Sequence, residues 1–142
     1  MRLTITLFSI WAFLSPASGQ VCSNQTSQGT YSVICTGYLS PAPGAPQAPF
    51  SEIAVVTSDS QGNFSGAGKI SLGGNILDHS VSGTAIIHRD CTGDIGYDQK
   101  INEKPAPKLN ITFHILDDGK EIRGMGTDTG ATVTCNLRLM SR

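Results

Sequence analysis

The densest group of reactive side chains in this chain lies in the stretch HRDCTGDIGYDQK, from His88 to Lys100. Its histidine and aspartates could exchange protons with a substrate, and its cysteine could act as a nucleophile if the thiol were free. The same stretch also has the composition of a tight turn. Asp90 can accept a hydrogen bond from the backbone two residues on, and Gly93 tolerates positive φ. Because both flanks resemble strands, the sequence favours a hairpin turn over an active site.

Cys91, in that turn, is one of four cysteines in the chain. Two conditions would have to hold for a nucleophilic Cys91: a free thiol and a neighbouring base. An even number of cysteines in a secreted chain instead predicts two disulfides, and none of the spacings resembles the close pairs of a zinc site. The predicted disulfide cysteines are Cys22, Cys35, Cys91 and Cys135.

The first nineteen residues have the pattern of a secretory signal peptide. Arg2 precedes an apolar run from Leu7 to Leu14, and the small residues Ala17 and Gly19 follow at the spacing of a cleavage site. The apolar run is too short for a membrane span. We therefore expect a signal peptide over 1–19 and one secreted domain over 20–142, a length usual for a single domain.

The charge and composition of the chain limit the classes of partner that it could bind. The formal net charge is −1 and no basic run occurs, which argues against nucleic acid and anionic membranes as partners. The chain's single tryptophan, Trp11, lies in the predicted signal peptide. Three Asn-x-Ser/Thr motifs would be glycosylation sites if the source is eukaryotic, at Asn24, Asn63 and Asn110.

Apolar and polar residues alternate with period two through most of the chain, and no stretch has the pattern of an amphipathic helix. Short strands are separated by turn sequences such as SQGN, GGN and DDGK. Gly83 is expected to form a bulge or bend between two strands, and SPAPGAPQAP and NEKPAPK are expected to be longer connections. This pattern predicts an all-β antiparallel domain of about eight strands. A closed barrel is favoured over a β-sandwich because hairpin-linked strands must protect their edges.

Four segments, CSNQTSQGTYSV, DSQGNFSGAG, VSGTAIIHRDCTG and ILDDGKEIRGMGTD, resemble a group of small, uncharacterised secreted bacterial proteins. The shared pattern is Gly-x-Tyr, then D-x-x-G-N-x-x-G, DCTG and DDG-x-E. In fold, the chain is also similar to the lipocalin-like barrels of the allene oxide cyclase and dirigent type. The resemblance covers most of residues 20–142, but its motifs are turns. It therefore implies an architecture and does not specify a reaction.

The resemblance also implies how the cysteines pair. The simpler sequences of that group carry the first pair without the second, so Cys22 is expected to bond Cys91 and Cys35 to bond Cys135. Closure of a barrel would make the first and last strands neighbours, which suits the second pair.

The candidate ligand-binding residues are His114, Arg123, Tyr38 and Glu121. They could form a polar patch inside an apolar cup, where they would orient a small ligand. The alternative is that they face water on the outer wall. The three histidines His79, His88 and His114 fall on separate strands without metal-site spacing. No metal or cofactor is predicted, and catalytic residues are not assigned.

Three functions are compatible with this sequence. The first is binding of a small apolar molecule in a cavity that small residues along the strands leave open. The second is a cofactor-independent cyclase or isomerase acting on an apolar, terpenoid- or polyketide-like substrate. The third is a structural or effector-like protein that acts through its outer surface. The residues expected to leave the space are Gly66, Gly68, Gly83, Ala85, Gly96, Gly124, Gly126 and Ala131.

Overall fold

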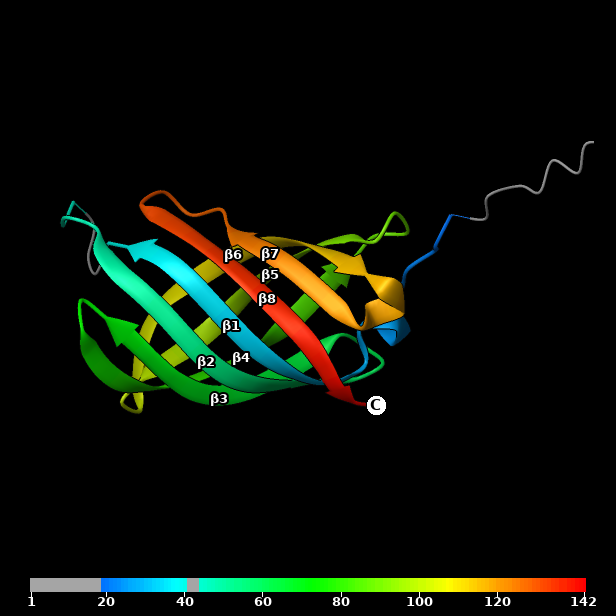
Figure 1. Cartoon of the computed structure of the whole chain (residues 1–142), viewed down its shortest axis with the longest axis horizontal. Coiled ribbons are helices and arrows are strands. Elements are labelled where there is room, and N and C mark those ends of the chain that lie inside the picture. The colour runs from blue at the N-terminus through cyan, green and yellow to red at the C-terminus, as the bar shows by residue number, and fades with distance from the viewer. Residues whose placement is uncertain (1–18, 41–43) are drawn as a thin grey trace, which may run out of the picture.

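The computed structural model describes residues 19–40 and 44–142, which form a closed barrel of eight antiparallel strands joined in chain order (Figure 1). The strands are β1 (Gly29–Leu39), β2 (Ala48–Ser58), β3 (Asn63–Leu72), β4 (Asn75–Ile87), β5 (Thr92–Ile101), β6 (Lys104–Leu116), β7 (Glu121–Gly126) and β8 (Ala131–Ser141). Two 3₁₀ turns, η1 (Asn24–Ser27) and η2 (Asp117–Gly119), accompany them. The predicted all-β closed barrel is confirmed. Residues 1–18 of the predicted signal peptide lie outside the described residues.

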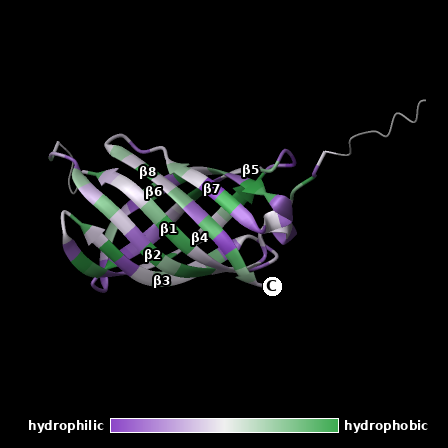
Figure 2. Cartoon of the chain, viewed as in Figure 1, coloured by the Kyte–Doolittle hydropathy of each residue, from purple (hydrophilic) through white to green (hydrophobic). Residues whose placement is uncertain are grey.

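The period-two alternation decides which side chains fill the barrel. In β1, Tyr31, Val33 and Cys35 are buried, whereas Ile34 and Thr36 between them are exposed. Figure 2 shows hydrophobic and hydrophilic residues alternating along the strands. None of the helical turns in the described part of the chain has the length and apolar character needed to cross a membrane.

Both expected disulfides form. Cys22 is bonded to Cys91, and Cys35 is bonded to Cys135. Cys35 and Cys135 are direct register partners because β1 closes the barrel against β8. Among the described residues no cysteine is free, so Cys91 has no thiol that could act as a nucleophile.

The first disulfide fixes a short segment across one end of the barrel. This end holds η1 and the chain terminus, on the right in Figure 1. The backbone N–H of Cys22 donates to the carbonyl of Arg89 at 3.2 Å, and the Asn24 amide nitrogen donates to the carbonyl of Gln61 at 2.7 Å. Below them, the buried Tyr31 hydroxyl donates to the carbonyl of Gly119 at 2.9 Å. The segment therefore caps the interior at this end.

The stretch from His88 to Lys100 contains the hairpin turn between β4 and β5, at residues 88–91, and most of β5. Asp90 Oδ1 accepts hydrogen bonds from the backbone N–H of Thr92 at 3.1 Å and from its hydroxyl at 2.7 Å, as expected of a turn aspartate. The positive φ is carried by Cys91, at 68°, and not by Gly93, which belongs to β5. The expectation for Gly93 was wrong because the positive-φ position of the turn lies two residues earlier in the chain.

Two further local predictions were wrong. Gly83 lies inside the continuous strand β4, with no register shift against either neighbour. The NEKPAPK segment is mostly strand: only Asn102 and Glu103 form the turn, both with positive φ, and β6 begins at Lys104. Its prolines are tolerated because β7 pairs with β6 only from Ile111 onward, so no ladder on that side needs their missing N–H groups.

Candidate interior binding site

The side chains predicted to form the polar part of the interior lie on the outer wall. His114 and Arg123 are exposed cross-strand partners on β6 and β7, and Glu121 is half-buried beside them. Tyr38 is also exposed, on β1. They point outward because their strands bury the alternate residues, such as Phe113 and Ile122. The expectation that these four side chains line the barrel interior was therefore wrong.

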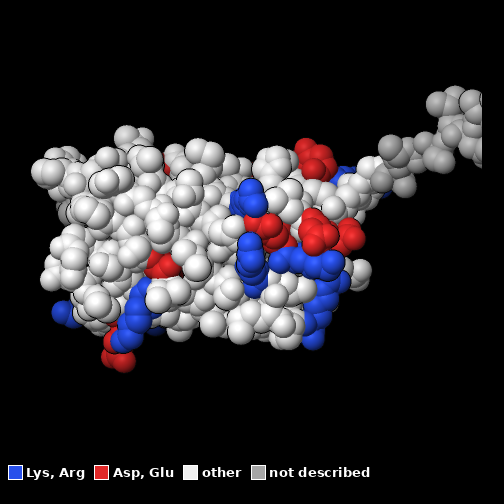
Figure 3. Space-filling model, viewed as in Figure 1, with Lys and Arg blue, Asp and Glu red and all other residues white. Residues whose placement is uncertain are grey.

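These outer residues have a local structure of their own. Arg123 Nε donates to Glu121 Oε1 at 2.7 Å, and the Asn136 amide donates to the same oxygen at 2.9 Å. These bonds hold the pKa of Glu121 below its ordinary value. His114 and Arg123 border a shallow depression of about 580 Å³ on the outer wall. Figure 3 shows a larger group of charged side chains toward the end where the chain terminates and a smaller group at the opposite end.

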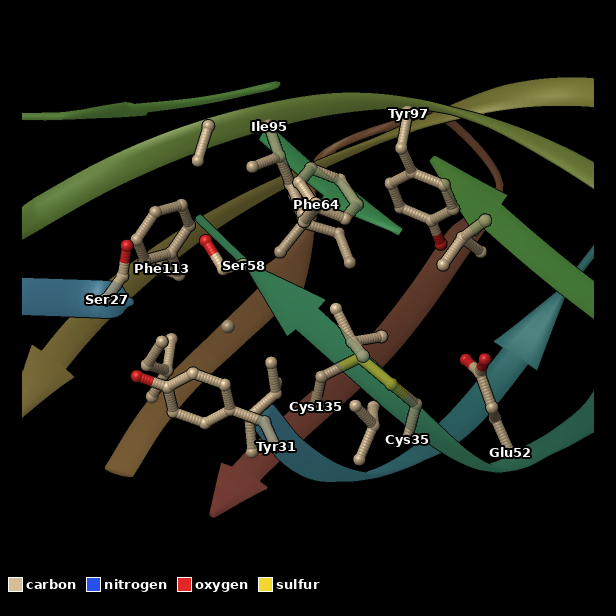
Figure 4. A pocket seen from close by; sticks show the side chains of 18 residues that line it. Ser27, Tyr31, Cys35, Glu52, Ser58, Phe64, Ile95, Tyr97, Phe113 and Cys135 are labelled. Carbon is tan, nitrogen blue, oxygen red and sulfur yellow. A yellow bond between two sulfur atoms is a disulfide. The ribbon is translucent and has the colours of Figure 1, made fainter. Parts of the chain in front are cut away.

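The barrel interior contains a cavity of about 110 Å³, several times the 10–15 Å³ that one water molecule requires. It extends from Ser27 and Ser58, near the capped end, to Glu52 and Tyr97 deeper in the barrel (Figure 4). Its wall is almost entirely apolar. The lining includes the aliphatic and aromatic side chains of Val33, Val56, Phe64, Val81, Ile95 and Leu137.

Only some of the small residues predicted to leave this space do so. Ala85 and Gly124 line the cavity, and Gly126 and Ala131 line a second void of about 10 Å³ beyond it, on the other side of Glu52 and Tyr97. That second void holds no more than one water. Gly96 is exposed and leaves no interior space.

The deep end of the cavity carries a buried chain of polar groups that the sequence analysis did not assign. His79 Nδ1 lies 2.8 Å from Glu52 Oε1, and His79 Nε2 lies 2.9 Å from Gln99 Oε1. His79 and Glu52 are only 4% and 7% exposed. Gln99 in turn donates from Nε2 to the carbonyl of Pro107. Four strands, β2, β4, β5 and β6, therefore contribute to one chain of hydrogen bonds.

The direction of these bonds follows from Pro107. A carbonyl only accepts, so the Gln99 amide group must donate to it and its oxygen must accept from His79. His79 Nε2 therefore carries a proton. Burial alone would lower the pKa of His79, but the hydrogen bond and negative charge of Glu52 raise it above its ordinary value. When His79 is protonated, it donates from both nitrogens, and the Glu52 carboxylate is its buried partner.

Two polar atoms at this end have no protein partner. Among the described residues, no hydrogen bond is formed by the Tyr97 hydroxyl or by Glu52 Oε2, and both residues line the cavity. Tyr97 is 8% exposed, and Figure 4 shows its hydroxyl and the Glu52 carboxylate directed toward one another. Burial, with the charges of Glu52 and Asp128, raises the pKa of Tyr97 far above its ordinary value. Tyr97 therefore remains a protonated hydrogen-bond donor across the physiological range.

The local backbone explains how these side chains meet. Glu52 on β2 and His79 on β4 are separated by β3, where Gly68 pairs directly with His79. Because Gly68 has no side chain, the carboxylate and the imidazole can approach across it. A Cβ at Gly68 would lie 2.6 Å from the Cβ of Ala54, closer than two carbons approach.

A register shift between β5 and β6 positions Gln99 and Pro107, which end the chain of hydrogen bonds. Between Tyr97 and Gln99 on β5, the single residue Asp98 faces two residues of β6, Pro107 and Lys108. An extra residue of this kind bends a strand and re-aims its neighbours. Here it brings the carbonyl of Pro107 to the Gln99 amide.

The sequence contained a signal for this site. Polar residues stand in phase with the apolar face in three strands: Glu52 between Phe50 and Ala54, His79 between Leu77 and Val81, and the pair Tyr97 and Gln99 between Ile95 and Ile101. In a strand that buries alternate residues, such a polar residue must be buried too. The predicted residues His114, Arg123 and Glu121 instead belong to the polar faces of their strands, which point outward.

The remaining predicted positions are on the surface or in the disulfides. Asn63 and Asn110 are exposed and Asn24 is half-buried, and glycosylation of the three stays a prediction. His88 lies 3.5 Å from Asp94 on the outside of the barrel. Within residues 19–40 and 44–142, no three histidine, cysteine or acidic side chains come together in a way that could hold a metal ion.

Comparison of the chain with protein-family models, curated proteins and solved structures gives no match. The interior geometry is therefore what bears on function.

Proposed function

We propose that this disulfide-stapled barrel binds a small apolar molecule that carries one hydrogen-bond acceptor, such as a ketone, inside its cavity. The observation that carries the proposal is the unpartnered Tyr97 hydroxyl at the end of an apolar space. A hydroxyl that faces an internal space without a protein partner is available to donate a hydrogen bond to a ligand atom or to water there. Apolar walls with one or two convergent polar groups are typical of small-molecule sites.

Charge and size restrict the ligand. The Glu52 carboxylate at the same end would repel an anionic ligand, whereas the Tyr97 hydroxyl would donate to a neutral carbonyl oxygen. The cavity is smaller than the ~150 Å³ cavity, engineered in another protein, that binds benzene. A single six-membered ring with one oxygen is therefore the upper limit of size, and a terpenoid would enter only if the cavity enlarged.

We further propose that the protein is secreted, with residues 1–19 as its signal peptide. Two disulfides are compatible with an oxidising compartment. The likeness to allene oxide cyclase and dirigent barrels is part of this proposal and concerns the fold alone.

A catalytic role is the second candidate function, and the buried pair of Glu52 and His79 favours it.

The test is a titration with 2-cyclohexen-1-one, followed by isothermal calorimetry. We expect a dissociation constant in the millimolar range, which corresponds to about −4 kcal/mol. Tyr97→Phe should weaken binding about 2- to 12-fold, the worth of one hydrogen bond of about 0.5–1.5 kcal/mol. Ala85→Leu should abolish binding because the added side chain occupies the cavity.

Two outer-wall substitutions serve as matched controls. Tyr38→Phe removes the same hydroxyl from an exposed tyrosine, and Ala67→Leu adds the same carbons to an exposed alanine of β3. Both variants should bind like the unmodified protein. If Ala85→Leu binds the ketone as well as Ala67→Leu does, the interior is not the binding site.

A further inference from the structure

The cavity end has the groups needed to move a proton on a bound ketone. Glu52 Oε2 is an acceptor without a protein partner, and the Tyr97 hydroxyl is a donor without one. Both are more than nine-tenths buried, and they meet at the same end of an apolar space. A carboxylate beside a substrate C–H can act as a base, and a donor beside the carbonyl oxygen can stabilise the negative charge that results.

We propose that the protein isomerises small β,γ-unsaturated ketones to their conjugated isomers, with Glu52 as the proton-transferring base and Tyr97 as the hydrogen-bond donor to the oxygen. This inference rests on the proposed function, because the ketone must first bind in the cavity. It assigns the substrate class and a reaction to the same site.

The reaction needs no co-reactant. Glu52 Oε2 removes a proton from the carbon between the carbonyl and the double bond. The C–H electron pair becomes a new carbon–carbon double bond, and the carbonyl π pair moves to the oxygen, which the Tyr97 hydroxyl stabilises. Glu52 then returns the proton to the far carbon of the original double bond, and the carbonyl re-forms. The double bond has moved by one position, and no proton or electron is gained or lost.

His79 acts through Glu52 and is a positioning residue. Its Nδ1 holds Glu52 Oε1 at 2.8 Å, which leaves Oε2 as the oxygen available to a substrate. Gln99 holds the other side of the imidazole at 2.9 Å. The other ionisable groups near Glu52 are Tyr97, which shares both voids with it, and Asp128, which lines the smaller void.

The test is conversion of 3-cyclohexen-1-one into 2-cyclohexen-1-one, followed by the ultraviolet absorbance of the conjugated product. Deuterium incorporation from heavy water, measured by NMR, gives a second readout of the same proton transfer. We expect the protein to accelerate both above the buffer rate. Glu52→Gln should lower kcat about 10²- to 10⁴-fold, and Tyr97→Phe about 10²- to 10³-fold.

The outer wall offers a matched control for each variant: Glu121→Gln, Tyr38→Phe and His114→Gln. These should retain the full rate. His79→Gln should lower kcat with little change in KM and shift the pH at which the rate reaches half its plateau, which a merely structural role would not do. Circular dichroism shows whether each variant is folded, and the near-isosteric Tyr97→Phe keeps the test informative if Glu52→Gln does not fold.

The two experiments distinguish a failure of ketone binding from a failure of ketone turnover. If 2-cyclohexen-1-one binds in the cavity but 3-cyclohexen-1-one is not converted faster than in buffer, this inference is overturned and the proposed function stands. Equal rates for Glu52→Gln and Glu121→Gln would also overturn it. If neither ketone binds, both proposals fall.

Discussion

Removing His79 alone should destabilise the protein far more than removing His79 and Glu52 together. In His79→Leu, the Glu52 carboxylate would be left in the interior, 7% exposed and without its partner at 2.8 Å. Breaking a buried ion pair in this way typically costs about 3–5 kcal/mol. Replacing both partners by apolar residues of similar size removes the stranded charge, and such double replacements are often neutral or stabilising.

The second single variant, Glu52→Met, leaves the imidazole Nδ1 without its partner, at a cost of about 1–3 kcal/mol. The double variant still leaves Gln99 Oε1 without its donor, which costs a similar amount. The two single losses therefore sum to about 4–8 kcal/mol, against about 1–3 kcal/mol for the double variant. The coupling between the two sites should therefore lie between about 1 and 7 kcal/mol.

Guanidinium chloride unfolding, followed by far-ultraviolet circular dichroism at neutral pH with the disulfides intact, measures all four proteins. Unchanged m-values would show that the variants unfold from a similarly compact state. His114→Leu, on the exposed wall, is the control and should change stability by less than about 0.5 kcal/mol. A cost below about 1 kcal/mol for His79→Leu, or strictly additive losses in the double variant, would refute the buried ion pair.

Three further predictions concern the frame that holds the cavity. Replacing Cys35 and Cys135 by alanine removes a bond that spans 100 residues, for which chain entropy gives an upper value near 4.7 kcal/mol. Denaturant unfolding should show that the free energy of unfolding falls by about 2–5 kcal/mol, and a change near zero would contradict this prediction. Gly119→Ala should lower the stability of the folded protein by more than about 1 kcal/mol, because φ there is +83° and the new Cβ would collide with the carbonyl of Thr26 in the cap. A thermal melt that matches the unmodified protein would show that the capping segment moves to accommodate the Cβ. Since the folded-state pKa of His79 is raised above 6.5, its stabilising effect is complete below that pH and is lost as pH rises through the folded value. Unfolding curves from pH 6 to 9 should show this fall in the unmodified protein and not in His79→Leu.

The period-two pattern was sufficient to predict the architecture. Alternation across residues 31–36 and 111–115 places every second residue inside, and hairpin turns link each strand to the next. Those two features lead to a closed meander. They do not reveal that Lys104 to Asn110 continues a strand, because proline usually ends one. That segment is strand because it pairs with β5, and its prolines are tolerated because β7 pairs with β6 only from Ile111 onward.

The candidate site was harder to predict, for a physical reason. Glu52, His79 and Gln99 lie on three different strands, and their contact depends on Gly68 and on the register shift at Tyr97. Neither feature can be derived from the spacing of residues within a strand. The sequence does show that each of these residues is in phase with an apolar face, and a search for in-phase polar residues would have found them.

The most direct measurement is a crystal structure of the protein soaked with 2-cyclohexen-1-one. We expect the ring in the cavity between Val81, Ala85 and Ile95, with its oxygen within hydrogen-bond distance of the Tyr97 hydroxyl. A ketone bound only at the outer depression beside His114 and Arg123, or an interior in which no ketone is found at a concentration that saturates binding in solution, would contradict an interior site.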